Sequence, residues 1–444
     1  MSVTSRALAR IVSGRLPDCQ DGCHAVAAFD SVEAGARPLC TRESSTMRRR
    51  REPIHVGVVY SLTGPYGLVG REMLNGVSLA IDEINAVDGN DFELVPLVFD
   101  PGGDLHRYEE AVEALIHDKG VHHIVGCYTS ASRKQVLPLL ERYDRLLWHS
   151  ARYEGFESSD NVIYVGAAPN QHIVPLAQHM IANIGVDVFC VGSNYIWTWE
   201  TTRVLQEIVT AASGRIVGKR LVALGDTDID HIVREIFEKR PPAIFNTLVG
   251  EASYLFHRRL RQAWRRAGVS DDDAPPILSC SLGEHELRLI GPSASTGHLT
   301  SAAYFSSIDT PENRSFVRRY RKAFSSETLP SADVEAAYLC GILLGRAVQQ
   351  AGNGNVRAVR DATYRETVDA PQGKVKVDPE TNHCYLTPRL ARSRRGYRFD
   401  IVEAAVAPVK PDPYLAWLDV DALVADSRRS GANDASSRRL RVVQ

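Results

Sequence analysis

The sequence predicts an α/β protein of two lobes, each built on a doubly wound, mostly parallel sheet with helices on both faces. Short apolar runs without polar alternation, such as residues 121–125, are typical of strands that are buried on both sides. Amphipathic helix patterns separate these runs, and this is the order of βαβ units. The same pattern restarts near residue 186, so a second unit follows the first.

Length and composition agree with a protein of this kind. The chain has 444 residues, 44% of them hydrophobic, and a net charge of −2. This length exceeds what one core usually supports, so we expect two lobes around a cleft. The nearly balanced charge argues against direct nucleic-acid binding. The sequence has no apolar run of about 18 residues or more, so we expect no membrane contact.

The first part of the chain has a different composition. Residues 1–52 are rich in Ser, Ala, Gly and Arg, and we interpret them as a disordered leader or a mis-assigned start, with Met47 as the alternative first residue. No sustained apolar segment forms a secretory signal, so we expect a reduced, cytoplasmic protein. Three cysteines and one histidine here match no standard zinc spacing, so we expect no metal. They are Cys19, Cys23, His24 and Cys40.

The first lobe is expected over residues 53–170. Its strands and helices alternate, which predicts a parallel sheet. The strands are expected over 54–60, 92–99, 121–125, 146–148 and 161–166, and the helices over 71–87, 105–119 and 131–142.

The second lobe is expected over residues 171–300. Its predicted strands are 186–191, 215–224, 243–249 and 277–281, and its predicted helices are 171–184, 201–212, 230–239 and 252–267. The chain then returns, so we expect about 305–355 to complete the first lobe and about 356–420 to complete the second. The Ser-, Arg- and Ala-rich residues 425–444 are expected to be a disordered tail.

Polar side chains follow the strands of the first lobe where ligands of open α/β sheets bind. We expect Ser130 to cap the next helix, whose free N–H groups suit a carbonyl, an amide or an anion. Ser61 and Thr63 serve either as ligand contacts or only as helix caps. The expected ligand contacts of this lobe are Ser61, Thr63, Tyr128, Ser130, His149, Ala151 and Arg152.

The second lobe offers an aromatic loop and one acid. Tyr195 and Trp197 are expected either to cover a ligand or to pack between helices. Glu251 follows a glycine at a strand end, where it would meet a cation or an amide N–H.

Signatures of enzymes and cofactor sites are missing. GxGxxG, Walker A, GxSxG and HExxH patterns do not occur in the chain, so we expect no cofactor and no common hydrolase. Cys127 is interpreted as a buried thiol, with an amidase nucleophile as the alternative. We therefore do not expect an enzyme.

Several motifs resemble a known family. They are DPGGD (100–104), GCYTSASRK (126–134), RYEGFE (152–157), APNQ (168–171), GSNYIW (192–197), YFSSIDTP (304–311), DAPQG (369–373) and PDPY (411–414). These motifs resemble the type I periplasmic-binding-protein fold and, within it, the cytoplasmic amide sensors that regulate aliphatic amidase operons. The resemblance implies a two-lobed clamshell that binds a small amide or urea-like ligand and holds an RNA-binding antiterminator protein inactive. Tyr128, Ser130 and Tyr195 match the family's cleft residues.

The chain also departs from the amide sensors. His149, Ala151 and Arg152 stand where the sensors carry Tyr, Thr and Pro, and Trp197 replaces a second tyrosine. If Arg152 faces the cleft, it favours a carboxylate over an amide; the alternative is a solvated side chain. The alternative function is the substrate-binding component of an ABC transporter for urea, short-chain amides or branched-chain amino acids. A homodimer is left open.

Overall fold

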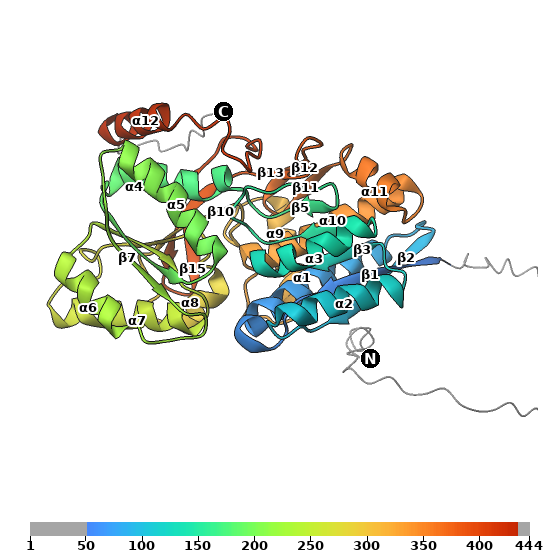
Figure 1. Ribbon diagram of the computed structural model, residues 1–444, viewed down its shortest axis with the longest axis horizontal. Coiled ribbons are helices and arrows are strands. Elements are labelled where there is room, and N and C mark those ends of the chain that lie inside the picture. The colour runs from blue at the N-terminus through green and yellow to red at the C-terminus, as the bar shows by residue number, and fades with distance from the viewer. Residues whose placement is uncertain (1–50, 434–444) are drawn as a thin grey trace, which may run out of the picture.

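The protein was analysed as a computed structural model, which describes residues 51–433. Figure 1 shows two lobes side by side, the first mainly in blue, cyan and orange and the second in green and yellow. Each lobe has a mostly parallel sheet between two helical layers, so the predicted fold class is confirmed. Our expectations for the leader, its cysteines and the end of the tail concern residues 1–50 and 434–444, which lie outside the described residues.

The sheet of the first lobe is fully parallel, in the order β2-β1-β3-β4-β5. Its strands are β1 (Glu52–Val59), β2 (Phe92–Phe99), β3 (His123–Gly126), β4 (Leu146–His149) and β5 (Val162–Tyr164). Every residue of β3, β4 and β5 is buried, which explains why these strands are apolar runs without alternation. β3 and β4 are neighbours, so the loops that follow them meet at one edge of the sheet.

Helices cover both faces of this sheet. One face packs against α1 (Gly67–Asn85) and α10 (Ala332–Ala351), and the other against α2 (Leu105–His117) and α3 (Ser130–Arg142). α1 and α10 approach closely because a Cβ at Gly76 would lie 2.4 Å from the Val334 carbonyl oxygen, so only glycine fits there. The 3-10 helix η3 (Gly64–Tyr66) precedes α1, and α9 (Pro311–Ala323) joins the α1–α10 layer.

The second lobe has the strand order β15-β14-β10-β9-β8-β6-β7. Five strands of this sheet are parallel to one another. They are β6 (Val188–Ser193), β7 (Ile216–Val222), β8 (Ala243–Thr247), β9 (Ile277–Ser279) and β10 (Leu299–Ala302). β14 (Arg389–Arg394) and β15 (Arg398–Ala404) add an antiparallel edge.

The helices of the second lobe also form two layers. α4 (Ile173–Asn183), α5 (Ile196–Ala211) and α12 (Val420–Asn433) share one core cluster, and α6 (Asp230–Lys239) and α7 (Glu251–Arg266) share the other. The 3-10 helix η4 (Pro169–Gln171) leads into α4, and α8 (Glu284–Ile290) packs near β15. None of the described helices has the length and apolarity needed to cross a bilayer.

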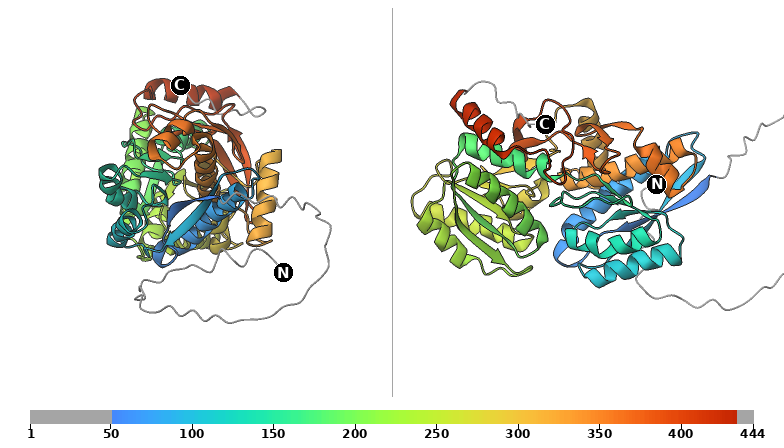
Figure 2. Two further views of the ribbon diagram at one scale, coloured as in Figure 1. Left: turned by 90° about the vertical axis from the view of Figure 1, so that its right-hand side faces the viewer. Right: turned by 45° about the horizontal axis from the view of Figure 1, so that its top comes forward.

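The expected disordered tail is wrong as far as residue 433. Figure 2 shows α12 lying along α4. Leu423 and Val424 bury their side chains in the second-lobe core, and Asp419 accepts a hydrogen bond from the Ala422 N–H at the start of the helix (2.9 Å). Because the apolar residues of this helix are few, its composition resembled a tail, and only the packing reveals its role.

We expected the chain after residue 356 to complete the second lobe, but the structure divides it between the two lobes. α11 (Val356–Thr363), β11 (Thr367–Ala370), β12 (Gly373–Val377) and β13 (Cys384–Tyr385) add a small antiparallel sheet to the first lobe. Val359, Val368 and Val375 join the first-lobe core, and this apolar burial holds the segment there. The chain passes between the lobes near 165–172, 303–310 and 386–388.

Candidate functional site

A cavity of about 40 Å³ lies between the lobes, at the loops that follow β3 and β4. One water needs roughly 10–15 Å³ of such space, so the cavity admits a molecule of a few heavy atoms in this conformation. Residues that we predicted from sequence line it together with residues that we did not predict. The predicted ones are Tyr128, Ser130, Ala151, Arg152, Tyr195 and Trp197, and the others are Tyr66, Thr129, Leu248, Val249, Ser281 and Glu286.

The start of α3 forms one wall of the cavity. Thr129, not Ser130 as we expected, is the N-cap: its hydroxyl oxygen accepts the Ser132 N–H at 3.1 Å. Because Thr129 takes the cap, the Ser130 hydroxyl is left to donate its hydrogen to the Glu154 carboxylate. The Ser130 oxygen can then only accept a hydrogen bond from a ligand.

A buried charge network supports this wall from beneath. Arg133 is fully buried, and its Nε lies 2.6 Å from Glu157 Oε1, while its Nη2 lies 3.3 Å from Glu154 Oε1. Burial by itself would raise the pKa of Glu157, but the Arg133 charge and hydrogen bonds from Arg133 and Lys134 lower that pKa to about 2. Glu154 thus joins the network to Ser130 and fixes the polarity of the hydroxyl.

His149 belongs to this support and does not line the cavity, contrary to our expectation. Arg133 Nη1 donates to His149 Nε2 (3.1 Å), so the other ring nitrogen carries the hydrogen and donates to the Gly126 carbonyl (3.3 Å). Burial and the Arg133 charge lower the pKa of His149 to about 3, so the ring is neutral.

Three other predicted residues also lie outside the cavity. The Ser61 hydroxyl accepts the Gly103 N–H at 2.8 Å, and Thr63 donates to Asp100 at 2.8 Å, so both hold the DPGGD turn instead of a ligand. The Glu251 side chain is 63% exposed and pairs with Arg258 on its own helix. Ser61, Thr63 and Glu251 do follow strand ends, but their polar groups already bind other groups of the protein.

Arg152 faces the cavity and is not the solvated side chain of the alternative interpretation. Its Nη1 lies 2.6 Å from Asp333 Oδ1, and its guanidinium carbon lies 5.9 Å from the centre of the Trp197 ring in the other lobe. Although burial alone would lower its pKa, the Asp333 charge raises the pKa of Arg152 above the ordinary value. The guanidinium is therefore charged but already neutralised by a carboxylate.

Glu286 is the most informative residue that sequence reasoning missed. It lies in the first turn of α8, and one of its carboxylate oxygens accepts the Gly283 N–H at 2.9 Å. Burial raises the pKa of Glu286 to about 7. The capping pattern of Gly283 and Glu286 is a local signal for a helix start, but nothing local indicates that this start faces Arg152.

Cys127 does not have the properties of an activated nucleophile. Its side chain is fully buried, and burial raises the pKa of the thiol to about 12. At neutral pH the sulfur is protonated and out of reach of a substrate. Within residues 51–433, no group of three or more His, Cys, Asp or Glu residues is arranged to hold a metal ion.

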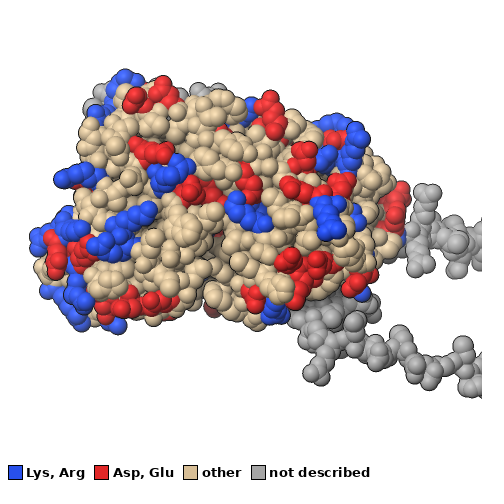
Figure 3. Space-filling model, viewed as in Figure 1, with Lys and Arg blue, Asp and Glu red and all other residues tan. Residues whose placement is uncertain are grey.

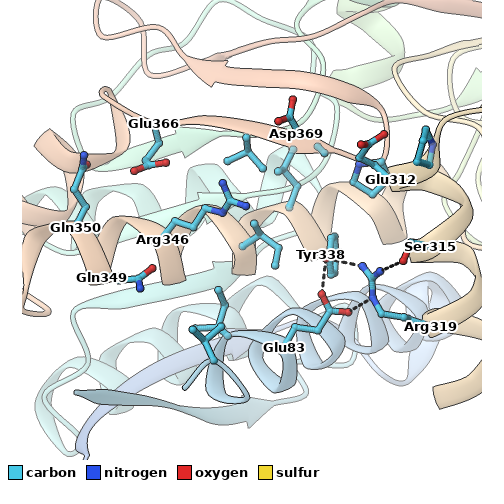
Figure 4. A pocket seen from close by; sticks show the side chains of 18 residues that line it. Glu83, Glu312, Ser315, Arg319, Tyr338, Arg346, Gln349, Gln350, Glu366 and Asp369 are labelled. Carbon is cyan, nitrogen blue, oxygen red and sulfur yellow. Dashed lines mark hydrogen bonds and ion pairs between the residues drawn. The ribbon is translucent and has the colours of Figure 1, made fainter. Parts of the chain in front are cut away.

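A larger hollow of about 850 Å³ lies away from the cleft, beside α1, α9 and α10 (Figure 4). Arg319 and Glu83 satisfy each other there: Arg319 binds Glu83 at 2.5 Å and Ser315 at 2.6 Å, and the Tyr338 hydroxyl donates to Glu83 at 2.7 Å. None of its lining residues carries a buried polar atom that lacks a partner among the described residues. We therefore regard it as a surface groove and the interlobe cavity as the candidate site.

The face seen in Figure 3 shows no charged patch that would suggest a second binding site. Lys and Arg side chains alternate there with Asp and Glu, without a broad region of one sign. The face is hollowed between the lobes at its lower edge. This face therefore offers no one-sign region that would attract a highly charged partner.

Known proteins resemble this chain in sequence and fold. A family model described as periplasmic binding protein domain matches residues 54–419. The Leu/Ile/Val-binding protein homolog 6 of Brucella abortus is 24% identical over 335 residues, which cover 74% of this chain and 85% of the relative. These matches extend over both lobes.

Solved structures of solute-binding proteins resemble this chain in fold. An R. palustris ABC transporter solute binding protein in complex with 4-hydroxybenzoate has a TM-score of 0.71 and 21% identity, covering 81% of this chain and 98% of the other. A leucine binding protein from Thermotoga maritima has a TM-score of 0.68 and 16% identity, covering 79% and 98%. With the family match over most of its length and an interlobe cavity at the strand ends, the chain belongs to the periplasmic binding protein family.

Proposed function

We propose that this protein is a receptor that captures a small, uncharged amide or urea-like molecule in the interlobe cavity and delivers it to a transport system. Ligand binding is the property common to the family. Our proposal concerns which class of ligand is bound and what the binding is for. The observation that carries the proposal is the hydrogen bond from Ser130 to Glu154.

This hydrogen bond makes the cavity wall complementary to an amide. The first N–H groups of a helix have no partner within it, so the start of α3 donates to a ligand carbonyl. Next to these donors, the Ser130 oxygen accepts an N–H, because its own hydrogen is given to Glu154. An amide or urea presents C=O and N–H side by side, whereas a carboxylate has only acceptors.

The charges around the cavity also favour a neutral ligand. Asp333 neutralises Arg152, and Glu286 adds a carboxyl group whose pKa burial raises to about 7. The wall therefore has no net positive charge with which to attract a carboxylate. The small volume of about 40 Å³ agrees with a ligand the size of acetamide or urea.

The relatives support transport as the role of this binding. The R. palustris protein is described as an ABC transporter solute binding protein, and the Brucella abortus relative as a Leu/Ile/Val-binding homolog. The motifs of the amide sensors support a second candidate, a ligand-gated regulator of amidase expression. The RYEGFE motif supplies the Glu154 that orients Ser130, and this ties the motif to amide recognition.

Calorimetric titration tests the ligand class. We expect the protein to bind acetamide or urea at least tenfold more tightly than acetate, and Ser130→Ala to weaken amide binding. The loss of one hydrogen bond of about 0.5–1.5 kcal/mol corresponds to roughly two- to tenfold. Thr63→Ala removes a hydroxyl outside the cavity and should leave the affinity unchanged. Tighter binding of acetate, or full affinity in Ser130→Ala, contradicts the proposal.

A second experiment separates the two roles. A transport receptor is expected outside the cytoplasm, whereas a regulator is expected in the cytoplasm with a partner protein whose complex is loosened by amide. Cell fractionation followed by co-purification with and without acetamide distinguishes them. Recovery only from the cytoplasm, in an amide-sensitive complex, overturns the transport role and supports regulation.

A further inference from the structure

A second cavity of about 40 Å³ lies beside the first and shares Arg152 and Ser281 with it. Its walls include the segments 165–167 and 302–304, where the chain passes between the lobes, and residues of α10. We call this cavity the hinge chamber. Because the two cavities share Arg152 and Ser281, the hinge chamber is a neighbouring space for a ligand held in the first cavity.

Unpartnered polar atoms are concentrated around the hinge chamber. Each of six lining residues has a buried polar atom without a hydrogen-bond partner among residues 51–433. They are Arg152 Nε, His172 Nδ1, Thr300 Oγ1, Ser301 Oγ, Glu335 Oε1 and Gln372 Oε1. Buried polar groups of native proteins are nearly always paired, so this concentration indicates a polar occupant.

The existing hydrogen bonds decide which of these atoms accept. His172 Nε2 lies 2.9 Å from the Tyr153 carbonyl oxygen, so Nε2 carries the hydrogen. Burial lowers the pKa of His172 to about 4, and in the neutral ring Nδ1 is an acceptor. Gln372 Nε2 donates to Glu335 Oε2 at 2.9 Å, which leaves the Gln372 oxygen as a second acceptor and Glu335 Oε1 as the free oxygen of the carboxyl group.

Two arginines near the chamber already have hydrogen-bond partners. Arg152 is paired with Asp333, and Arg389 of β14 donates to the carbonyl oxygens of Ala303 and Gln372. Burial raises the pKa of Glu335 to about 8, despite the Arg389 charge, so at neutral pH Oε1 carries a hydrogen. Oε1 becomes an acceptor when an ammonium group binds beside it and that hydrogen is released to water. The chamber thus offers acceptors on His172 and Gln372 and, once it is ionised, on Glu335, while Asp333 balances the charge of Arg152.

We propose that the hinge chamber is a second subsite, which binds an N–H-rich group, an amine or a second amide, at the far end of a ligand held by its first amide at the start of α3. The inference rests on the proposed function of the first cavity, and it narrows the ligand class to bifunctional amides. His172 and Gln372 receive N–H hydrogens, and Glu335, once ionised, pairs with an ammonium group.

Paired ligands test this subsite by calorimetry. Glycinamide, β-alaninamide and 4-aminobutanamide are each compared with the monoamide of equal length: acetamide, propanamide and butanamide. Malonamide and succinamide provide a neutral second N–H group. We expect at least one bifunctional compound to bind tenfold or more tightly than its matched monoamide. A gain for amino amides alone identifies an ammonium subsite, and a gain for diamides as well identifies a general N–H subsite.

Glu335→Gln supplies the matching variant. Because the new amide oxygen must accept the hydrogen bond from Gln372, its NH₂ group takes the place of Glu335 Oε1 and can neither ionise nor accept an N–H. We expect the variant to lose the tenfold gain while keeping the monoamide affinity. Glu284→Gln makes the same change at a buried glutamate that lines neither cavity, and it should keep the gain.

The possible results distinguish failure of the hinge-chamber proposal from failure of the proposed amide selectivity of the first cavity. If monoamides bind and no bifunctional compound gains, or if Glu335→Gln weakens both classes equally, the hinge chamber is not a subsite. If bifunctional compounds bind in a Glu335-dependent way and monoamides bind no better than acetate, the subsite stands and the proposed amide selectivity of the first cavity falls. If none of the compounds binds, both proposals fail.

Discussion

Replacing Arg133 by methionine tests how the cleft wall is supported. The Arg133 side chain has no exposed surface and pairs with both Glu154 and Glu157. Methionine keeps most of the apolar stem but removes the charge. Taking one partner from a buried ion pair costs about 3–5 kcal/mol, because the remaining carboxylates stay buried, here with only the half-exposed Lys134 as a charged partner. We therefore expect Arg133→Met to lower the free energy of unfolding by about that amount.

The pKa of Glu157 gives a second measure of how much this charge network stabilises the fold. Its pairing lowers the pKa from the ordinary 4.5 to about 2. Each pKa unit corresponds to about 1.4 kcal/mol, so the shift contributes about 3 kcal/mol to stability. Because the pKa is lower in the folded state, this contribution is complete above pH about 4.5 and is lost as the pH falls towards about 2.

Urea unfolding followed by tryptophan fluorescence measures the effect. The double variant Arg133→Met/Glu157→Gln should recover part of the loss, because it removes one of the two stranded carboxylates. Arg394→Met is the matched control, since Arg394 pairs with Asp400 at the surface, where such a pair contributes about 0–1 kcal/mol. A loss in Arg133→Met no larger than in this control would refute the reasoning.

Three further predictions concern charge, packing and pH. Asp333→Asn frees Arg152 from its partner, so acetate should gain affinity relative to acetamide in competition titrations; an unchanged ratio contradicts the charge argument. Leu423→Ala should destabilise the second lobe by about 2–5 kcal/mol in urea unfolding, since this α12 side chain is buried in the second-lobe core, and wild-type stability would show that α12 does not pack there. Glu157→Gln should flatten the loss of stability between pH 4.5 and pH 2; an acid transition like that of the wild type would assign the loss to other groups.

Sequence reasoning reached part of the site because strand ends can be located from apolar runs. It predicted Tyr128, Ser130, Ala151 and Arg152 in one lobe and Tyr195 and Trp197 in the other; all of them line the candidate cavity, and their contact with a ligand stays a prediction. It failed at Ser61, Thr63, His149 and Glu251, which occupy similar strand ends. The difference is their partners: these side chains bind internal groups that come from other segments.

The fold class, the alternation of strands and helices and the loops that border the cleft were determined by the sequence alone, because apolar periodicity is a local property of the chain. The tertiary structure decided which polar groups remain available to a ligand. Glu154 commits the Ser130 hydrogen, and Asp333 neutralises Arg152 across 181 positions of the chain. Hydrogen bonds and ion pairs act over a few ångströms in space, so a chain must be folded before its binding chemistry is defined.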